Sequence, residues 1–251
     1  MRLFVVTGAS RGMGAAIAGQ LLGDPGHAVL GIARRSSETL AAVAAKSGAT
    51  VEQWQADLAE PIGVATRLHG WLAARDAAEF TQATLINNAG VVTKIGALEN
   101  CSVEELSAAL RVGLEAPLLL TAAFLRATAR WHGERRVLNI SSGLGRRAMA
   151  GQATYCAAKA GMDNLSRAVA LDQALVDNGA KIVSLAPGVI DTDMQAQLRA
   201  GDAAGFPEQQ VFLKLKESGQ LASSREAAAR VIAYLGRADF GAVPVADVRD
   251  T

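Results

Sequence analysis

Short apolar runs rich in β-branched residues alternate with longer Ala-rich segments along all 251 residues of the chain. This alternation predicts strands joined by helices, the pattern of a parallel sheet covered on both faces. Most of the runs are apolar nearly throughout, as in strands buried on both sides. Strands are expected at Leu3–Val6, His27–Ala33, Thr50–Gln55, Ala83–Asn87, Arg136–Ile140, Lys181–Leu185 and Ala242–Val245. The sequence therefore predicts the α/β class, with a doubly wound, seven-stranded parallel sheet in a single domain over residues 1–251.

Helical periodicity fills most of the segments between these strands. Helices are expected at Gly12–Leu22, Glu38–Ala45, Pro61–Arg75, Val103–Ala129, Thr154–Val176 and Arg225–Leu235. The fourth begins with a capping box, in which Ser102 precedes Glu105 by three positions. The stretch from Asp191 to Ser218 fits neither period and contains glycine and proline, so an irregular substrate loop is predicted over about residues 191–220.

Charge and composition exclude several classes of partner. Lys and Arg number 25 against 24 Asp and Glu, so no overall field favours nucleic acid. Two cysteines suit a reducing, cytoplasmic location, and three widely spaced histidines offer no metal cluster. The N-terminal apolar run is too short for a signal peptide. The apolar stretch Ala116–Leu125 is shorter than the roughly 20 residues of a spanning helix, so no membrane partner is expected.

A glycine-rich segment, Thr7–Gly14, joins the first predicted strand to the first helix. A turn at this place brings its backbone against a pyrophosphate and aims a helix N-terminus at it, and side chains at the glycine positions would obstruct the approach. The spacing is Gly-x-x-x-Gly-x-Gly, and a tight turn without a ligand is the alternative interpretation. The residues assigned to this cradle are Gly8, Ser10, Arg11, Gly12, Met13 and Gly14.

The end of the second strand indicates which dinucleotide is bound. NAD-preferring sites place an acidic residue there for the ribose 2′-hydroxyl, whereas this chain has Ala33 followed by Arg34 and Arg35. With Arg11 and the Ser10 hydroxyl, these guanidinium groups suit a 2′-phosphate. The alternative is a pair of solvated arginines. The cofactor prediction is NADP(H).

Ser142, Tyr155 and Lys159 form the candidate catalytic set. Tyr and Lys four residues apart lie on one face of a helix, where the ammonium is expected to lower the pKa of the phenol and suit it to general acid catalysis. Ser142 follows the fifth strand, at the sheet edge where ligands bind. A surface Tyr–Lys pair without function is the alternative.

The ordered motifs resemble those of the short-chain dehydrogenase/reductase family over essentially the full chain. Thr7–Gly14 matches its TGxxxGxG loop, Asn87–Gly90 its NNAG segment, Asn139–Ser142 its serine segment and Tyr155–Lys159 its YxxxK motif. The step from Ser142 to Tyr155 is also typical of the family and selects Ser142 over Ser141. The resemblance implies a Rossmann-type fold.

The resemblance also implies a mechanism in which the pro-S hydride of a nicotinamide passes to a carbonyl carbon. Tyr155 would protonate the developing alkoxide, Ser142 would orient it, and Lys159 would hold the nicotinamide ribose while lowering the Tyr155 pKa. It further implies a homodimer or homotetramer formed through the long helices at Val103 and Thr154. Further cofactor contacts implied by the motifs are Asp57, Leu58, Asn88, Ala89, Gly90, Pro187, Gly188, Ile190 and Thr192, besides Tyr155 and Lys159.

One position departs from the family pattern. Gly113 stands where the family usually has a catalytic asparagine that helps to hold a water near the lysine. Two rival hypotheses therefore stay open: a non-catalytic NADP(H)-binding sensor, and a 3-oxoacyl-carrier-protein reductase, for which Arg146 and Arg147 would supply a basic patch.

Within the family, Asp191–Gln195 and the later stretch up to Ser223–Glu226 resemble the sepiapterin reductase and benzil reductase branch, and the C-terminal Val245–Thr251 adds to this resemblance. An aspartate near the C-terminus anchors the pterin in sepiapterin reductases, and Asp247 falls near that position, although a surface carboxylate is an equal interpretation. The residues predicted to line the pocket for a small-molecule carbonyl substrate are Leu144, Met149, Gln152, Met194 and Asp247. Their apolar members favour a hydrophobic ketone, diketone or pterin-like carbonyl.

Overall fold

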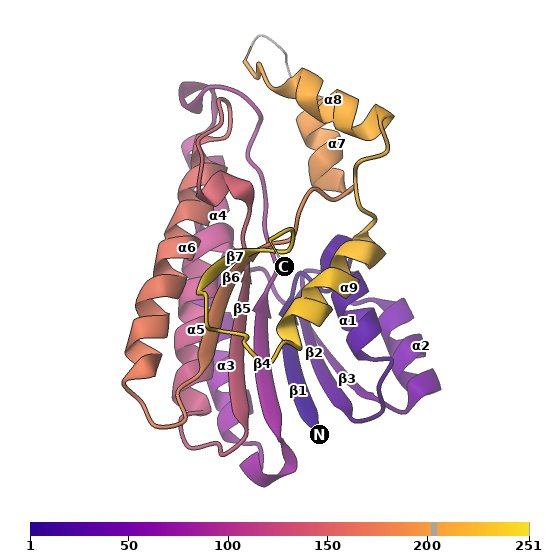
Figure 1. Ribbon diagram of the computed structural model, residues 1–251, viewed down its shortest axis with the longest axis vertical. Coiled ribbons are helices and arrows are strands. Elements are labelled where there is room, and N and C mark those ends of the chain that lie inside the picture. The colour runs from indigo at the N-terminus through magenta and orange to yellow at the C-terminus, as the bar shows by residue number, and fades with distance from the viewer. Residues whose placement is uncertain (202–204, 251) are drawn as a thin grey trace.

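The computed structural model describes residues 1–201 and 205–250, and a seven-stranded parallel sheet runs through it (Figure 1). The strand order is β3-β2-β1-β4-β5-β6-β7, which confirms the predicted doubly wound sheet. The order reverses between β1 and β4, and this reversal opens a crevice at the carboxyl ends of the strands. The strands are β1 (Arg2–Thr7), β2 (His27–Ala33), β3 (Thr50–Gln55), β4 (Gln82–Asn87), β5 (Glu134–Ile140), β6 (Lys181–Ala186) and β7 (Val245–Asp247).

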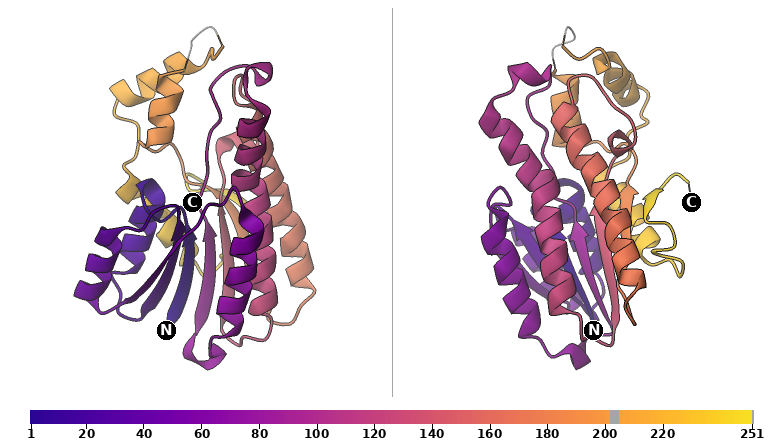
Figure 2. Two further views of the ribbon diagram at one scale, coloured as in Figure 1. Left: turned by 180° about the vertical axis from the view of Figure 1, so that it is seen from behind. Right: turned by 90° about the vertical axis from the view of Figure 1, so that its left-hand side faces the viewer.

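Helices cover both faces of the sheet (Figures 1 and 2). One layer holds α1 (Gly12–Leu21), α2 (Glu38–Ser47) and α9 (Ser224–Leu235), and the other holds α3 (Pro61–Ala73), α4 (Val103–Leu110), α5 (Ala116–Ala127) and α6 (Ala153–Ala174). Strand side chains alternate between the two cores. In β1, Phe4 and Val6 pack with α1 and α9, whereas Leu3 and Val5 pack with α3 and α5.

The long helix predicted from Val103 is interrupted by one wide π-helical turn at Arg111–Glu115, between α4 and α5. The helical run Val103–Ala127 is long and apolar enough to cross a membrane by length and composition, with a mean hydropathy of 1.6 over an 18-residue window. The length of Ala116–Leu125 therefore does not by itself exclude a membrane-spanning helix, because the helical run is longer than that stretch. In the fold, α5 packs against α3, and Leu120 and Phe124 are fully buried in the core.

The segment after β6 differs from the predicted irregular loop, because it contains two helices, α7 (Asp193–Arg199) and α8 (Gln209–Glu217). Both lie above the carboxyl ends of the strands (Figure 1). The aromatic rings of Phe206 and Phe212 stack with centroids 5.6 Å apart, which supplies an apolar anchor that short polar helices otherwise lack. Residues 202–204 of the predicted loop lie outside the described residues.

The last strand begins three residues later than predicted. The turn at Ala242–Pro244 precedes β7, and the Ser184 amide donates to the Pro244 carbonyl at 2.8 Å. The pairing then places Asp247 beside Ala186, at the carboxyl end of β6.

Candidate active site

A cleft of about 1100 Å³ opens at the carboxyl ends of the strands, below α7 and α8. Every residue that the sequence assigned to catalysis and to the cofactor borders it. Four of the five predicted substrate residues, Leu144, Met149, Gln152 and Met194, border it as well. Among the residues that the structure describes, Asp247 is the exception, and its neighbour Arg249 borders the cleft instead.

The glycine-rich loop is held by the end of β4. The Thr7 hydroxyl accepts hydrogen bonds from the backbone amides of Asn88 and Ala89, both at 2.9 Å, and the Asn88 side chain donates to the Thr7 carbonyl. A Cβ atom at Gly14 would lie 2.2 Å from the Gly8 carbonyl oxygen, so only glycine permits this turn. Gly8 and Gly12 have positive φ angles of 68° and 56°, which glycine adopts without strain.

The beginning of α1 and the end of β2 suit an anionic ligand. Helix α1 begins at Gly12 with no side-chain cap, so its first backbone amides are available to a phosphate. Arg34 and Arg35 are exposed on the cleft and make no hydrogen bond or ion pair with any described residue. The arrangement of a close-packed glycine cradle, an uncapped helix and free guanidinium groups fits a dinucleotide phosphate.

Arg11 has a protein partner that the sequence did not reveal. Its guanidinium pairs with Asp193 at the start of α7, so the glycine-rich loop and α7 are connected across the cleft. Both side chains are more than half exposed, so this pair contributes little stability. A bound 2′-phosphate would compete with Asp193 for Arg11.

Ser142 follows β5 and caps the short 3-10 turn Gly143–Gly145, since its Oγ accepts from the Leu144 amide at 3.2 Å. Tyr155 stands in the first turn of α6 and borders the same cleft as Ser142, which lowers the pKa of its phenol in part. A strand end and a helix start therefore bring the two hydroxyl-bearing residues to one cleft.

The Tyr155 phenol has a raised pKa, not the lowered one expected. Burial raises the pKa of Tyr155 to about 12, because it outweighs the hydrogen bond from Ser142, which lowers it. Lys159 does not outweigh this burial, since its Nζ lies 5.6 Å from the centre of the phenol ring and donates to the Ile140 carbonyl at 2.6 Å. The phenol thus keeps its proton throughout the physiological pH range.

Lys159 is 3% exposed, and its burial lowers its pKa to about 8, although the charge of Asp163 raises it in part. A lysine in this state is charged near neutral pH and loses its charge in mildly alkaline solution. Its position on α6, one turn after Tyr155, is the one predicted from the spacing.

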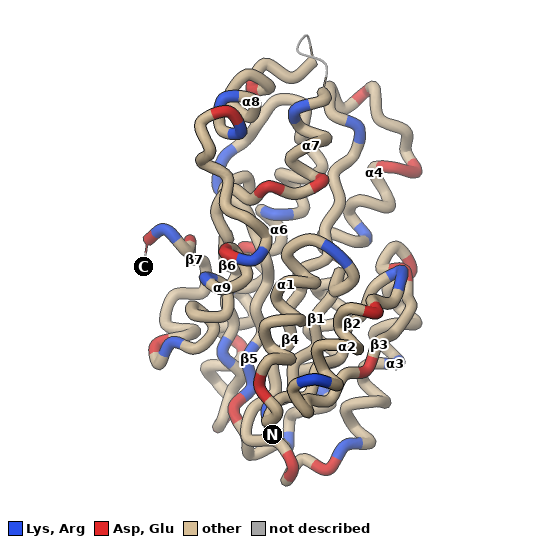
Figure 3. The backbone as a smooth tube through the Cα atoms, turned by 90° about the vertical axis from the view of Figure 1, so that its right-hand side faces the viewer, with Lys and Arg blue, Asp and Glu red and all other residues tan. Residues whose placement is uncertain are grey.

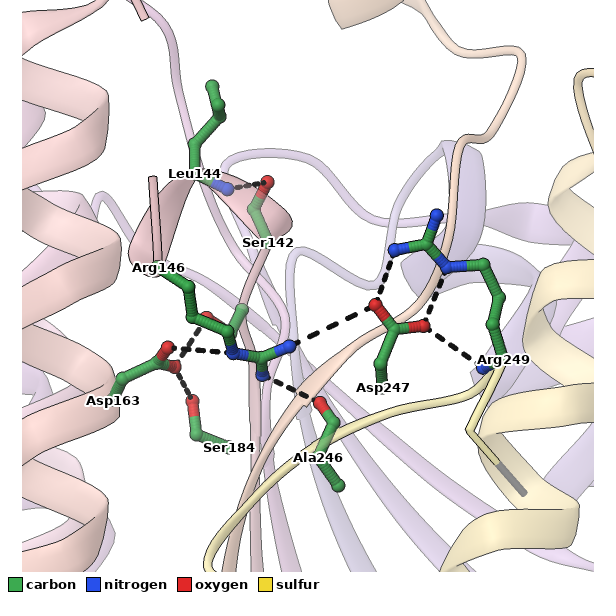
Figure 4. Close-up of polar contacts among 9 residues, drawn as sticks. Ser142, Leu144, Arg146, Asp163, Ser184, Ala246, Asp247 and Arg249 are labelled. Carbon is green, nitrogen blue, oxygen red and sulfur yellow. Dashed lines mark hydrogen bonds and ion pairs between the residues drawn. The ribbon is translucent and has the colours of Figure 1, made fainter. Parts of the chain in front are cut away.

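Behind these groups lies a network that the sequence did not reveal (Figure 4). Asp163 on α6 accepts from the hydroxyls of Ser141 and Ser184, both at 2.6 Å. Arg146 lies between Asp163 and Asp247, with its Nε 3.4 Å from Asp163 Oδ2. The spacing of Asp163 from Lys159 was the one available signal, since i and i+4 share a helix face.

Asp247 does not border the cleft. It is 4% exposed, and Arg249 binds its two carboxylate oxygens at 2.8 and 2.6 Å. These hydrogen bonds lower the pKa of Asp247. The structure therefore corrects the predicted substrate role of Asp247: its carboxylate is used internally.

An apolar cluster closes the substrate side of the cleft. Leu144 and Met149 come from the segment between β5 and α6, and they pack with Leu198 of α7 and Phe212 of α8. Tyr155 and Cys156 pack against the same cluster. The cavity wall next to the phenol is therefore hydrophobic.

Acidic and basic residues are interspersed over the face shown in Figure 3, in keeping with the near-zero net charge. Among the residues near the serine segment, Arg146 is exposed but its Nη2 donates to the Ala246 carbonyl at 2.7 Å. Of the two arginines considered for a basic patch, Arg146 is therefore engaged within the protein, and the patch stays a prediction.

Comparisons with known proteins agree with this geometry. The profile of the family described as short chain dehydrogenase matches residues 2–203. A benzil reductase of Bacillus cereus, described as (S)-benzoin forming, is 33% identical over 240 residues, covering 96% of each chain. A sepiapterin reductase of Rattus norvegicus is 32% identical, covering 94% of this chain and 92% of its own. A solved short-chain dehydrogenase/reductase structure from Burkholderia vietnamiensis is 36% identical, with a TM-score of 0.67 and coverage of 99% and 97%.

Proposed function

Because this chain belongs to the short-chain dehydrogenase family, we propose that it is an NADPH-dependent carbonyl reductase acting on a small ketone, diketone or pterin-like carbonyl. The family consists of oxidoreductases of carbonyl and alcohol groups that use a nicotinamide cofactor. The observation that carries the proposal is the convergence of Ser142, Tyr155 and Lys159 on one cleft that also contains the glycine-rich loop.

NADPH is favoured over NADH by the end of β2. Arg34 and Arg35 line the cleft where an NAD site would place a carboxylate, and their guanidinium groups are free of protein partners among the described residues. A 2′-phosphate would receive charge-assisted hydrogen bonds there, whereas a ribose hydroxyl would receive weaker ones. Asp57 and Leu58 border the adjacent part of the cleft and suit the adenine.

The proton in the proposed reaction comes from Tyr155. A pKa of about 12 keeps the phenol protonated at neutral pH, so the general acid carries its proton when each turnover begins. Ser142, which borders the same cleft as the phenol, orients the carbonyl oxygen and stabilises the charge that develops on it. The cofactor, when bound, supplies the hydride.

Lys159 completes the mechanism through its charge. Its ammonium is anchored by the Ile140 carbonyl and lies behind the phenol, where it favours the phenolate left after proton transfer. The same ammonium is in place to hold the ribose of the cofactor.

The apolar wall formed by Leu144, Met149, Leu198 and Phe212 supports a hydrophobic substrate. This fits the name of the Bacillus cereus relative, a reductase of a diaryl diketone. An acyl-carrier-protein reductase is less well supported, because Arg146 is occupied by Asp163 and leaves Arg147 as the sole free cation of that pair.

Exposed apolar residues on two neighbouring helices support a homodimer or homotetramer. Leu118 on α5 is 43% exposed and Leu171 on α6 is 71% exposed. The two helices contact each other, so their exposed leucines are candidates for an interface between copies of this chain.

The decisive experiment follows oxidation of NADPH and, in parallel, NADH by absorbance, with benzil, an aliphatic α-diketone, sepiapterin and a β-ketoacyl thioester. Turnover of a diketone or pterin with NADPH supports the proposal. Preference for the thioester would favour the carrier-protein reductase. Binding of NADPH by fluorescence without turnover of any carbonyl would favour the sensor.

A further inference from the structure

Asp163 is a buried carboxylate that the proposed reaction does not use. It is 1% exposed and stands one helical turn after Lys159 on α6. Its Oδ1 accepts hydrogen bonds from Ser141 on one strand end and from Ser184 on the neighbouring strand. A charge this deeply buried is costly unless it is paired, so its surroundings need a cation.

Arg146 is that cation. Asp163 Oδ2 accepts no hydrogen bond from the described residues, and the Arg146 Nε lies 3.4 Å from it. The turn that carries Arg146 can lie close to Asp163 because it contains Gly145. A Cβ atom at Gly145 would lie 2.7 Å from Asp163 Oδ2. The approach is therefore built into the local sequence.

The C-terminal strand holds Arg146 from its other side (Figure 4). The Arg146 Nη2 donates to the Ala246 carbonyl at 2.7 Å, and its Nη1 lies 3.9 Å from Asp247 Oδ2. Arg249 in turn binds the Asp247 carboxylate. A series of alternating charges thus connects the cleft to the helix that carries Lys159. It consists of Arg249, Asp247, Arg146 and Asp163.

We propose that Asp163, paired with Arg146, is a positioning residue that supports the positive charge on Lys159 and fixes the strand end beside Ser142. The effect of Asp163 on turnover through Lys159 rests on the proposed function. The effect of the Asp163 charge on the Lys159 charge does not depend on any catalytic activity.

The electrostatic environment of Lys159 among the described residues is simple enough to test. On α6 it has Tyr155 on one side and Asp163 on the other, and β5 presents the Ile140 carbonyl. From the π-helical turn that faces α6, Arg111 pairs with Glu60, and Glu115 is exposed. Asp163 is the one group whose charge raises the pKa of Lys159 against the effect of burial.

The test uses Asp163→Asn, which keeps an oxygen that accepts from both serines and removes the charge. Lysine labelled with ¹³C at Cε is titrated by NMR in the protein without cofactor, and the Lys159 signal is identified by its loss in Lys159→Met. We expect the Lys159 midpoint to fall by about one pH unit, because a neighbouring opposite charge has been removed. Arg146→Gln is expected to act in the same direction, since a buried carboxylate without its cation takes up a proton.

Two further variants make the result specific. Arg146→Lys keeps the cation, so its Lys159 midpoint is expected to lie close to the wild-type value. Arg237→Gln removes a surface arginine paired with Asp239 and is expected to leave the midpoint unchanged. An unchanged Lys159 midpoint in folded Asp163→Asn, or in folded Arg146→Gln if the first variant does not fold, overturns the proposal.

The pH profile of turnover separates this proposal from the proposed function. If the wild-type protein reduces carbonyls, the alkaline fall in kcat should move to lower pH in Asp163→Asn, in step with the NMR midpoint. A role confined to structure would lower kcat at every pH without moving that fall, and would contradict the proposal. If the wild-type protein reduces none of the carbonyls, a shifted midpoint still supports the coupling while the proposed function fails.

Discussion

A Cβ atom at Gly113 would lie 3.0 Å from the Cβ of Ala158, the residue directly before Lys159. Gly113 is buried in the wide turn between α4 and α5, and it lets this turn approach α6 closely. A second close contact joins the same two segments from the other side: a Cβ at Gly161 of α6 would lie 2.8 Å from the Leu114 side chain of the turn. The glycine that replaces the family's asparagine is thus part of the packing between two helices, not merely a missing amide.

This contact predicts that Gly113→Asn harms the protein. The larger side chain would press on Ala158 and displace the helix that carries Tyr155 and Lys159. We expect a loss of about 1–3 kcal/mol in the free energy of unfolding, as in other overpacked sites. Urea denaturation measures it, and Gly113→Asn combined with Ala158→Gly should recover part of the loss. Higher activity with unchanged stability in the single variant would contradict this packing argument.

Tyr155→Phe should remove the proton donor and leave the cofactor site intact. Turnover is expected to fall by about 10²–10⁴-fold, the usual contribution of a general acid. NADPH binding, followed by fluorescence, should change little. Tyr234→Phe is the matched control, because Tyr234 packs against Phe240 in the core and is outside the cleft. Equal losses in the two variants would exclude the acid role of Tyr155.

Arg34→Ala should weaken NADPH and spare NADH. Loss of a charge-assisted hydrogen bond to a phosphate corresponds to about 1.5–3 kcal/mol, which is about 10–100-fold in Kd. Isothermal titration of both cofactors measures the ratio, with Arg130→Ala as an exposed-arginine control outside the cleft. A proportional loss of NADH affinity would show that Arg34 does not read the 2′-phosphate.

The rate of carbonyl reduction should be level near neutral pH and fall as the pH rises through about 8. Lys159 is protonated below its pKa of about 8 and neutral above it, whereas Tyr155, with a pKa of about 12, stays protonated across this range. The charge that favours proton transfer is therefore lost first. The dependence of kcat on pH under saturating NADPH measures it. A rate that rises between pH 7 and pH 9 would contradict this assignment.

Local patterns were sufficient to predict most of the fold. Most of the strands from β1 to β6 are apolar runs buried between two helical layers, and such runs are visible without knowledge of the packing. The edge strand β3 is the exception, since it is largely polar and only its Trp54 is buried. Helices α7 and α8 were missed because they are short and flanked by glycine and proline, and because their apolar residues, Leu198 and Phe212, find partners only in the folded chain. The late start of β7 has a similar cause, since its pairing with β6 decides it.

The site was predictable where function depends on spacing. The step from Tyr155 to Lys159 and the glycine positions of the loop are local, and the structure brings them to one cleft. The network of Arg146, Asp163 and Asp247 joins residues from three distant segments, so no local pattern contains it. The Tyr155 pKa was misjudged for a related reason, since burial is a property of the whole fold.

The exposed leucines on α5 and α6 predict that the protein associates through this face. Leu171→Asp should shift the protein toward monomer, because a carboxylate placed between two apolar surfaces would be buried without a partner. Ile62→Asp is the matched control, since Ile62 on α3 is 70% exposed, nearly as much as Leu171. Light scattering coupled to size-exclusion chromatography distinguishes the states. A wild-type monomer would contradict the predicted association, and an oligomer that Leu171→Asp leaves intact while Ile62→Asp dissociates it would place the interface elsewhere.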